Sequence, residues 1–257
     1  MRSLLSRSVT PRIVDVPMTL SRLPRGLAGL TIVQITDVHV GPFVGRRFVA
    51  DVVRRVNELA PDLVAITGDL VDGPAALFKH GVEPLADLRS RYGTFYVTGN
   101  HEYYSGVEDW LPILRGHGLR VLRNERVEIE RDGAVLDLAG VDDHESHRWG
   151  RGHGADLPRA LDGRDEARPV VLLAHQPRQV RVAARHNVDL QISGHTHGGQ
   201  IWPWHAAVML QQGGLLAGRY TFGATQLYVS RGTGYVGPAV RIGAPAEISR
   251  ITLRCAG

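Results

Sequence analysis

The sequence contains almost no cysteine and no long apolar segment. Cys255 is the single cysteine among 257 residues, which excludes an intrachain disulfide and a thiolate-rich metal site. No segment approaches the roughly 18 consecutive apolar residues of a transmembrane helix. The N-terminal segment lacks the continuous apolar run of about 7–15 residues that a signal peptide contains. We therefore expect a cytoplasmic protein or, if further residues precede this sequence, a membrane-associated or exported one.

Lysine is also rare, because only Lys79 among the 30 basic residues is lysine and the other 29 are arginine. We attribute this bias to a GC-rich genome rather than to an arginine surface for phosphate-rich partners. The formal net charge of +4 is spread along the chain without a basic run, so we do not expect nucleic acid as a partner. No obligate protein partner is evident, and the length suits one large domain.

The first half of the chain alternates predicted strands and helices. Three segments, residues 30–36, 63–67 and 94–98, are apolar and rich in β-branched residues, as buried strands are. Apolar residues at helical spacing predict helices over residues 49–59 and 75–89. This order predicts parallel strands joined by right-handed crossovers, so that all three strands end at one edge of a sheet.

The second half contains shorter predicted elements. Alternating runs between residues 120 and 139 suggest an antiparallel meander. Residues 142–168 are polar and rich in glycine, which predicts a long surface loop with a short helix near residues 157–161. Apolar segments at residues 170–174 and 188–193 predict two further strands.

Side chains of the kinds that bind metal ions follow the predicted strands in five short blocks. Because the strands share an edge, we expect these side chains to form one polar site. In an extended chain, residues two apart point to the same side, so the two members of an Asp-x-His or His-x-His block can face one cation. The candidate ligands are Asp37, His39, Asp69, Asn100, His175, His195 and His197.

This ligand set predicts a centre of two divalent metal ions. Carboxylate, amide and imidazole ligands together suit Mn, Fe or Zn, and they fit an all-oxygen Ca or Mg site poorly. Seven ligands exceed the needs of one tetrahedral ion, but they serve two ions with four contacts each if one carboxylate bridges. Asp69 is the natural bridge, because it follows the second strand alone. Two such ions would produce a bridging hydroxide for in-line attack on phosphorus.

The order Asp-x-His, Gly-Asp, Gly-Asn-His, His, Gly-His-x-His resembles that of the calcineurin-like metallophosphoesterase superfamily. Its details resemble a bacterial phosphodiesterase branch, whose members often carry N-terminal membrane segments or export signals. The resemblance implies an α/β fold, a four-layer α-β-β-α sandwich of two mixed sheets with a dinuclear metal site at the strand-end rim. Residues 30–257 would form this domain, and residues 1–29 an N-terminal extension or edge segment.

The resemblance also implies a role for each block. His101 corresponds to the family's histidine that is not a ligand, which hydrogen-bonds the phosphate and can protonate the leaving oxygen. The first metal would be held by Asp37, His39, Asp69 and His197, and the second by Asp69, Asn100, His175 and His195.

The segment after the last block, residues 201–210, contains two tryptophans and several aliphatic residues. We favour a packed hairpin that closes the second sheet. The alternative is a lipid-touching flap, which would imply a phospholipid or lipid-linked substrate and peripheral contact with a membrane. Further candidates for lining the substrate pocket are Tyr103, Tyr104, Asp143, Trp202 and Arg231.

The sequence thus predicts a metal-dependent phosphoric ester hydrolase, and a phosphodiesterase in particular. A phosphomonoesterase or protein phosphatase would use the same centre and is the first alternative. A non-catalytic scaffold of the same fold is a second, but such scaffolds lose ligand residues and none is missing here. A nuclease is a third, and the absence of a basic stripe argues against it.

Overall fold

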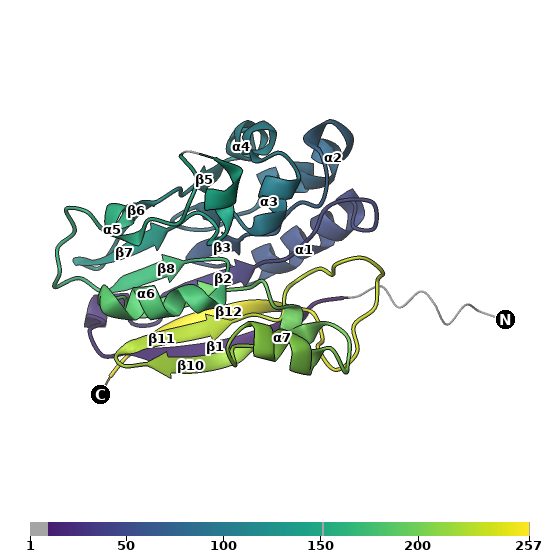
Figure 1. The fold of residues 1–257 in the computed structure, drawn as a ribbon. Coiled ribbons are helices and arrows are strands. Elements are labelled where there is room, and N and C mark those ends of the chain that lie inside the picture. The colour runs from purple at the N-terminus through teal and green to yellow at the C-terminus, as the bar shows by residue number, and fades with distance from the viewer. Residues whose placement is uncertain (1–9, 151, 257) are drawn as a thin grey trace.

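The computed structural model describes residues 10–150 and 152–256, and these form two six-stranded sheets that pack face to face. Helices cover the outer face of each sheet (Figure 1). The α/β fold expected from the sequence, a four-layer α-β-β-α sandwich of two mixed sheets, is confirmed.

The first sheet contains the three parallel strands expected in the first half of the chain. These are β2 (Thr31–Ile35), β3 (Leu63–Thr67) and β4 (Thr94–Val97), which pair in that order. The C-terminal strand β12 (Glu247–Cys255) runs antiparallel to β2. At the far side, β5 (Leu119–Val121) pairs with β4 in parallel.

Part of the N-terminal segment belongs to this sheet. Strand β1 (Arg12–Leu20) pairs in parallel with β12 along its whole length and forms the edge of the sheet. Met18 and Leu20 are buried in the core between the sheets, and the 3₁₀ turn η1 (Arg25–Leu27) follows. Residues 12–20 of the N-terminal segment are therefore an edge strand of the first sheet.

The helices on the first sheet bury one apolar stripe each. Helix α1 (Arg46–Glu58) buries its four valines against the sheet, as the spacing predicts. Helix α4 spans Val107–Gly116. The helix expected over residues 75–89 is shorter: α2 covers Ala75–Val82, and a 3₁₀ turn, η2 (Glu83–Asp87), replaces its second half. Proline at position 84 explains this, because it lacks the N–H that an α-helix would need there.

The strands of the second sheet are β6 (Glu125–Arg131), β7 (Ala134–Gly140), β8 (Val170–Leu173), β9 (Leu190–Ser193), β10 (Gly218–Phe222) and β11 (Thr225–Val229). They lie in the order β10-β11-β9-β8-β7-β6. The expected antiparallel meander between residues 120 and 139 is wrong in part, because β5 lies in the first sheet and only β6 and β7 form an antiparallel pair. Outside the sheet lie α5 (Leu157–Ala160) and α6 (Val180–Arg185).

The central core lies between the two sheets. Ile32 and Leu63 contribute to it from the first sheet, and Leu138 and Val171 from the second, all of them inaccessible to solvent or nearly so. Burial of this apolar surface from both sides holds the sheets together. It therefore also fixes the position of the loops at one sheet relative to those at the other.

Two long connections differ in how well the sequence describes them. The described residues 142–150 and 152–168 form the expected long connection, with a 3₁₀ turn, η3 (Ser146–Trp149), and the short helix α5. The hairpin favoured for residues 201–210 is wrong. This segment leads into helix α7 (His205–Gln211), none of whose residues is buried, and the hairpin is formed by β10 and β11. Among the described residues, no helix is long and apolar enough to cross a membrane.

Candidate metal centre

The polar blocks occupy the loops at one end of both sheets, as the parallel strand order requires. Asp37 and His39 follow β2, and Asp69 follows β3. After β4, Asn100 opens the short helix α3 (Asn100–Tyr104). The second sheet contributes His175 after β8 and His195 and His197 after β9, the latter opening the 3₁₀ turn η5 (His197–Gly199).

These loops hold an unusual backbone conformation. Positive φ angles of 48° to 72° occur at five of the expected ligands, although none is glycine. Such angles cost free energy for residues with a Cβ atom, and they cluster at functional sites where the surrounding structure enforces them. The five are Asp37, His39, Asp69, His195 and His197.

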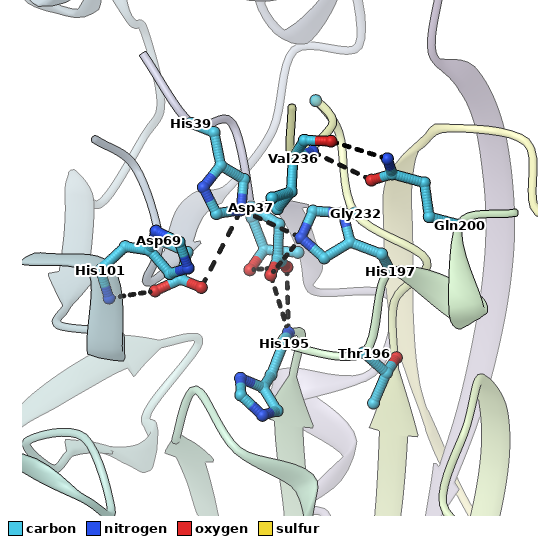
Figure 2. Close-up of polar contacts among 12 residues, drawn as sticks. Asp37, His39, Asp69, His101, His195, Thr196, His197, Gln200, Gly232 and Val236 are labelled. Atoms are coloured by element: carbon cyan, nitrogen blue, oxygen red, sulfur yellow. Dashed lines mark hydrogen bonds and ion pairs between the residues drawn. The ribbon is translucent and has the colours of Figure 1, made fainter. Parts of the chain in front are cut away.

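The ligand atoms of these residues lie in overlapping groups, in each of which the atoms are within 4.8 Å of one another. Figure 2 shows how the side chains of Asp37, His39, Asp69 and His197 converge. Asp69 belongs to two groups, one with His39 and one with His175. Its Oδ2 lies 3.9 Å from His39 Nε2 and 3.1 Å from His175 Nε2. The Asp69 carboxylate could therefore contact a cation in each of the two groups.

Each half of the site has its own close contacts between ligand atoms. On one side, His197 Nε2 lies 3.0 Å from His39 Nε2 and 3.4 Å from Asp37 Oδ1. On the other, His195 Nδ1 lies 3.2 Å from His175 Nε2. The Oδ1 atom of Asn100 is buried and has no hydrogen-bond partner among the described residues. Converging lone pairs and an unsatisfied amide oxygen fit divalent cations well.

Hydrogen bonds outside the site orient these ligands. The His175 Nδ1–H donates to the carbonyl of Thr67 at 2.8 Å, which leaves Nε2 free to bind a cation. The Thr36 hydroxyl donates to Asp37 Oδ2 at 2.8 Å. The backbone N–H of His195 donates to Asp37 Oδ1 at 2.9 Å and so ties the two sheets together at the site.

Two glycines have no room for a side chain beside these carboxylates. A Cβ atom on Gly99 would overlap the carboxylate of Asp69, and one on Gly194 would overlap that of Asp37. The glycines in the blocks therefore allow the ligand loops to approach one another closely.

Burial holds several of the imidazoles in the form that binds metals. It lowers the pKa of His39 to about 4 and that of His195 to about 3. Both rings are therefore neutral at pH 7, and the neutral ring is the ligand. Burial also raises the pKa of the Asp37 carboxyl group to about 6, so removal of this carboxylate from water is unfavourable without a cation nearby.

His101 lies beside the ligands, and its ring is paired with the carboxylate of Asp72. Its Nδ1 is 3.2 Å from Asp72 Oδ1, and its backbone N–H donates to Asp69 Oδ1 at 2.9 Å. Burial acts to lower the pKa of His101, but the hydrogen bond with Asp72 and the charge of Asp69 outweigh it, so the pKa is raised. Sequence reasoning missed Asp72 as a site residue, although its place three residues after Asp69 was a usable signal.

Glu102 was also missed, and it connects two of the ligand loops. Its fully buried carboxylate accepts hydrogen bonds from the N–H groups of Asp69, Leu70, Val71 and Gly99, at 2.6 to 3.2 Å. Burial and the neighbouring Asp69 raise its pKa to about 7. A carboxylate in this position fixes the Asp69 loop against the start of α3, and so sets the distance between Asp69 and Asn100.

Arg241 is a third residue that sequence reasoning missed. Its guanidinium lies 3.1 Å from His197 Nδ1 and donates to the backbone carbonyls of Arg231 and Ala244. Nothing in the local sequence indicates this, because Arg241 lies 44 residues after His197 and reaches it across a loop.

A cavity of about 550 Å³ opens beside the ligands. It reaches from Asn100, His195 and His197 to Trp204 and Val208 in the segment around α7. Of the five candidates for lining the substrate pocket, Tyr104 lines this cavity.

The other four candidates lie elsewhere and remain predictions. Tyr103 is buried against Thr98, and Asp143 is buried and accepts hydrogen bonds from the Gln176 amide. Arg231 forms an ion pair with Glu247 at 3.0 Å. Trp202 is 68% exposed and is not among the residues that line this cavity.

The chain is similar to known proteins of one family. The family model described as calcineurin-like phosphoesterase matches residues 30–199. The transmembrane protein with metallophosphoesterase domain of Bos taurus is 43% identical over 264 residues, which cover 98% of this chain and 59% of that protein. An uncharacterized metallophosphoesterase of Aquifex aeolicus is 36% identical over 254 residues, covering 96% of this chain and 93% of that protein. The chain thus spans about three fifths of the bovine relative.

A solved structure shows the same fold at low sequence identity. The dimetal phosphatase from Danio rerio superposes with a TM-score of 0.51 and 14% identity, covering 88% of this chain and 99% of that chain. The likeness concerns the fold, and therefore the arrangement of two sheets with loops that meet at one end.

Proposed function

Because the chain belongs to the calcineurin-like phosphoesterase family, a family of metal-dependent phosphoester hydrolases, we propose that it hydrolyses phosphodiesters at a centre of two divalent cations. The observation that carries this proposal is the position of Asp69 between two sets of ligand atoms. Asp37, His39 and His197 form one group of close ligand atoms, and Asp69 forms another with His175 and His195. We propose Asn100, whose Oδ1 is buried without a partner among the described residues, as a further ligand of the second group. Mn, Fe and Zn all suit this set of ligands.

The chain's own residues supply the rest of the proposed chemistry. Two cations held here would place positive charge beside the phosphoryl oxygens and acidify a water molecule for attack. His101, held by Asp72, carries a proton next to the site and can donate it to the departing oxygen. The raised pKa of His101 favours the protonated ring that this role needs. The geometry of the ligand atoms supports the proposed metal site, and the lining of the cavity supports the proposed class of ester.

The cavity favours a diester over a monoester. Arg178 is the only arginine or lysine among the described residues that line it, and four lining residues are apolar: Ile201, Trp204, Val208 and Val236. The second ester group of a diester can occupy this apolar part, whereas a monoester has no such group to place there. A phosphomonoesterase or protein phosphatase on the same centre is the alternative.

The test compares bis(4-nitrophenyl) phosphate with 4-nitrophenyl phosphate after loading with Mn, Fe or Zn. We expect metal-dependent release of 4-nitrophenolate from both esters and a higher kcat/KM for the diester. A higher kcat/KM for the monoester would establish the alternative. If neither ester is hydrolysed while elemental analysis shows two bound metals per chain, the proposed activity is excluded. Asn100→Ala serves as the metal-site control, since it removes one ligand of the second cation.

The surface around α7 supports a lipid-linked or phospholipid substrate and contact with a lipid bilayer. Five large apolar side chains are exposed on α7 and the neighbouring loops, which we name the apolar rim: Trp202 (68%), Trp204 (65%), Met209 (45%), Leu210 (84%) and Ile242 (51%). Trp204 also lines the cavity, so the apolar rim is continuous with the proposed active site. Exposed tryptophan and leucine side chains of this kind insert into the interface of a bilayer. The bovine relative is named as a transmembrane protein, which is consistent with work at a membrane.

Replacement of Trp202 and Leu210 by serine is expected to weaken binding to vesicles of phosphatidylcholine and phosphatidylglycerol. Transfer of each apolar side chain from water is worth about 1.5–3 kcal/mol, so the double variant should lose at least about tenfold in affinity. Cosedimentation measures this loss. Leu77→Ser is the matched control, because Leu77 is 70% exposed on α2, outside the apolar rim. Equal vesicle binding by the wild type and the double variant would contradict membrane contact through this surface.

A further inference from the structure

Arg178 is an arginine without a partner inside the cavity. It lies in the 3₁₀ turn η4 (Pro177–Gln179), three residues after the ligand His175, and it lines the cavity beside Asn100 and His195. Its side chain is partly buried. No hydrogen bond or ion pair connects it to any of the described residues.

The other described arginines either have a hydrogen-bond or ion-pair partner or are exposed to solvent. Those that are partly buried have partners, such as Arg123 with Asp142 at 2.7 Å and Arg126 with Asp137 at 3.1 Å. Those without partners, such as Arg181, are exposed to solvent. A guanidinium withdrawn from water and left unpaired is unfavourable, so an unpaired one at a cavity wall is ready to bind an anion.

Gln212 provides a second, independent observation on the same cavity. It caps the C-terminal end of α7, is only 4% exposed and lines the cavity. Its Oε1 is buried without a hydrogen-bond partner among the described residues. The carboxylate of Glu145, which also lines the cavity, lies 3.5 Å from Arg148 and forms its ion pair there. It therefore does not neutralise Arg178.

We propose that Arg178 and Gln212 form a subsite for a second phosphoryl group, next to the one held at the metal centre. A guanidinium binds phosphoryl oxygens through two parallel hydrogen bonds, and the Nε2–H group of the Gln212 side chain can donate a third. The substrate class is then a diphosphate ester, with the scissile phosphorus at the cations and its neighbour at Arg178. This inference rests on the proposed function and narrows it.

Two chromogenic substrates test the subsite: uridine 5′-(4-nitrophenyl phosphate) and the β-(4-nitrophenyl) ester of uridine 5′-diphosphate. In both, water forms a new P–O bond at the aryl-bearing phosphorus and the P–O(aryl) bond breaks. The products are 4-nitrophenolate and UMP from the first, or 4-nitrophenolate and UDP from the second. The second substrate differs only by one additional phosphoryl group. We expect the metal-loaded protein to hydrolyse it with a kcat/KM at least about tenfold higher, because a charge-assisted hydrogen bond contributes about 10–100-fold.

The Arg178→Gln variant should lower the ratio of these two kcat/KM values by at least about tenfold. Gln212→Glu should lower it too, because its negative charge repels the second phosphoryl group. Arg181→Gln, which removes an exposed and unpaired arginine three residues away, should leave both rates unchanged. Metal content and melting temperature show whether each variant is folded. Arg178→Lys keeps the positive charge but lacks the two parallel N–H donors of the guanidinium, so it should keep part of the wild-type preference for the second substrate.

Two results would overturn the subsite while leaving the proposed function intact. The wild type could hydrolyse both esters with equal kcat/KM, or Arg178→Gln could lower both values by the same factor. In the second case Arg178 contacts the phosphoryl group that the two substrates share. Absence of turnover on both esters by the metal-loaded wild type would instead contradict the phosphodiesterase proposal itself.

Discussion

Replacement of Asp69 by asparagine is expected to remove nearly all turnover. The carboxylate of Asp69 faces ligand atoms on both sides of the site, so the loss of its charge weakens the binding of both cations. The asparagine side chain has almost the same volume but offers one oxygen in place of two. Loss of an outer partner of a metal ligand alone costs about 10–100-fold, and loss of a shared ligand should exceed this range. Elemental analysis and kcat/KM on bis(4-nitrophenyl) phosphate measure the effect.

The matched control for this change is Asp162→Asn, because Asp162 is an exposed aspartate outside the site. It should keep the metal content and the turnover of the wild type. If Asp69→Asn kept two metals per chain and normal turnover, Asp69 would not bridge the cations. The assignment of the two ligand groups would then have to be abandoned.

Replacement of His101 by alanine should separate proton transfer from metal binding. If His101 donates a proton to the departing oxygen, its loss should lower kcat by about 10²–10⁴-fold for an alkyl leaving group. The effect should be much smaller for 4-nitrophenolate, which leaves without a proton. Asp72→Asn should show the same dependence on the leaving group in weaker form, because it removes the negative charge beside the His101 ring. Rates for a series of esters with leaving groups of different pKa measure this dependence.

The geometry also permits His101 to be a ligand, since its ring lies within reach of His39 and Asp69. Metal content distinguishes the two roles. Two metals per chain in His101→Ala would support proton transfer, whereas the loss of one metal, together with an equal loss of rate on every ester, would show that His101 binds a cation.

The sequence by itself determined the candidate ligands and the order of the first strands. Each block follows an apolar, β-branched segment, and the alternation with helices implies parallel strands. Asp37, Asp69 and Asn100 therefore had to reach one edge, whatever the details of the core. These signals are local, because a strand, the turn after it and the side chain at its end lie within a few residues. The same reasoning reached the sandwich of two sheets only through the resemblance.

The tertiary structure decided what depends on contacts between distant segments. The run at residues 119–121 alternates like β6 and β7, yet it joins the other sheet, because packing against α4 and β4 determines its place. The segment after His197 could pack or remain exposed, and only the folded chain shows that α7 buries none of its residues.

The same holds for the residues that surround the ligands. Glu102 accepts hydrogen bonds from backbone N–H groups about 30 residues away in sequence. Arg178 and Gln212, which are distant in sequence, line the same cavity. The role of a buried carboxylate or of an unpaired guanidinium depends on the groups around it in space, and no local pattern of residues predicts those groups. The sequence therefore determined which side chains could bind metals, and the fold decided which other side chains hold them in place and shape the cavity beside them.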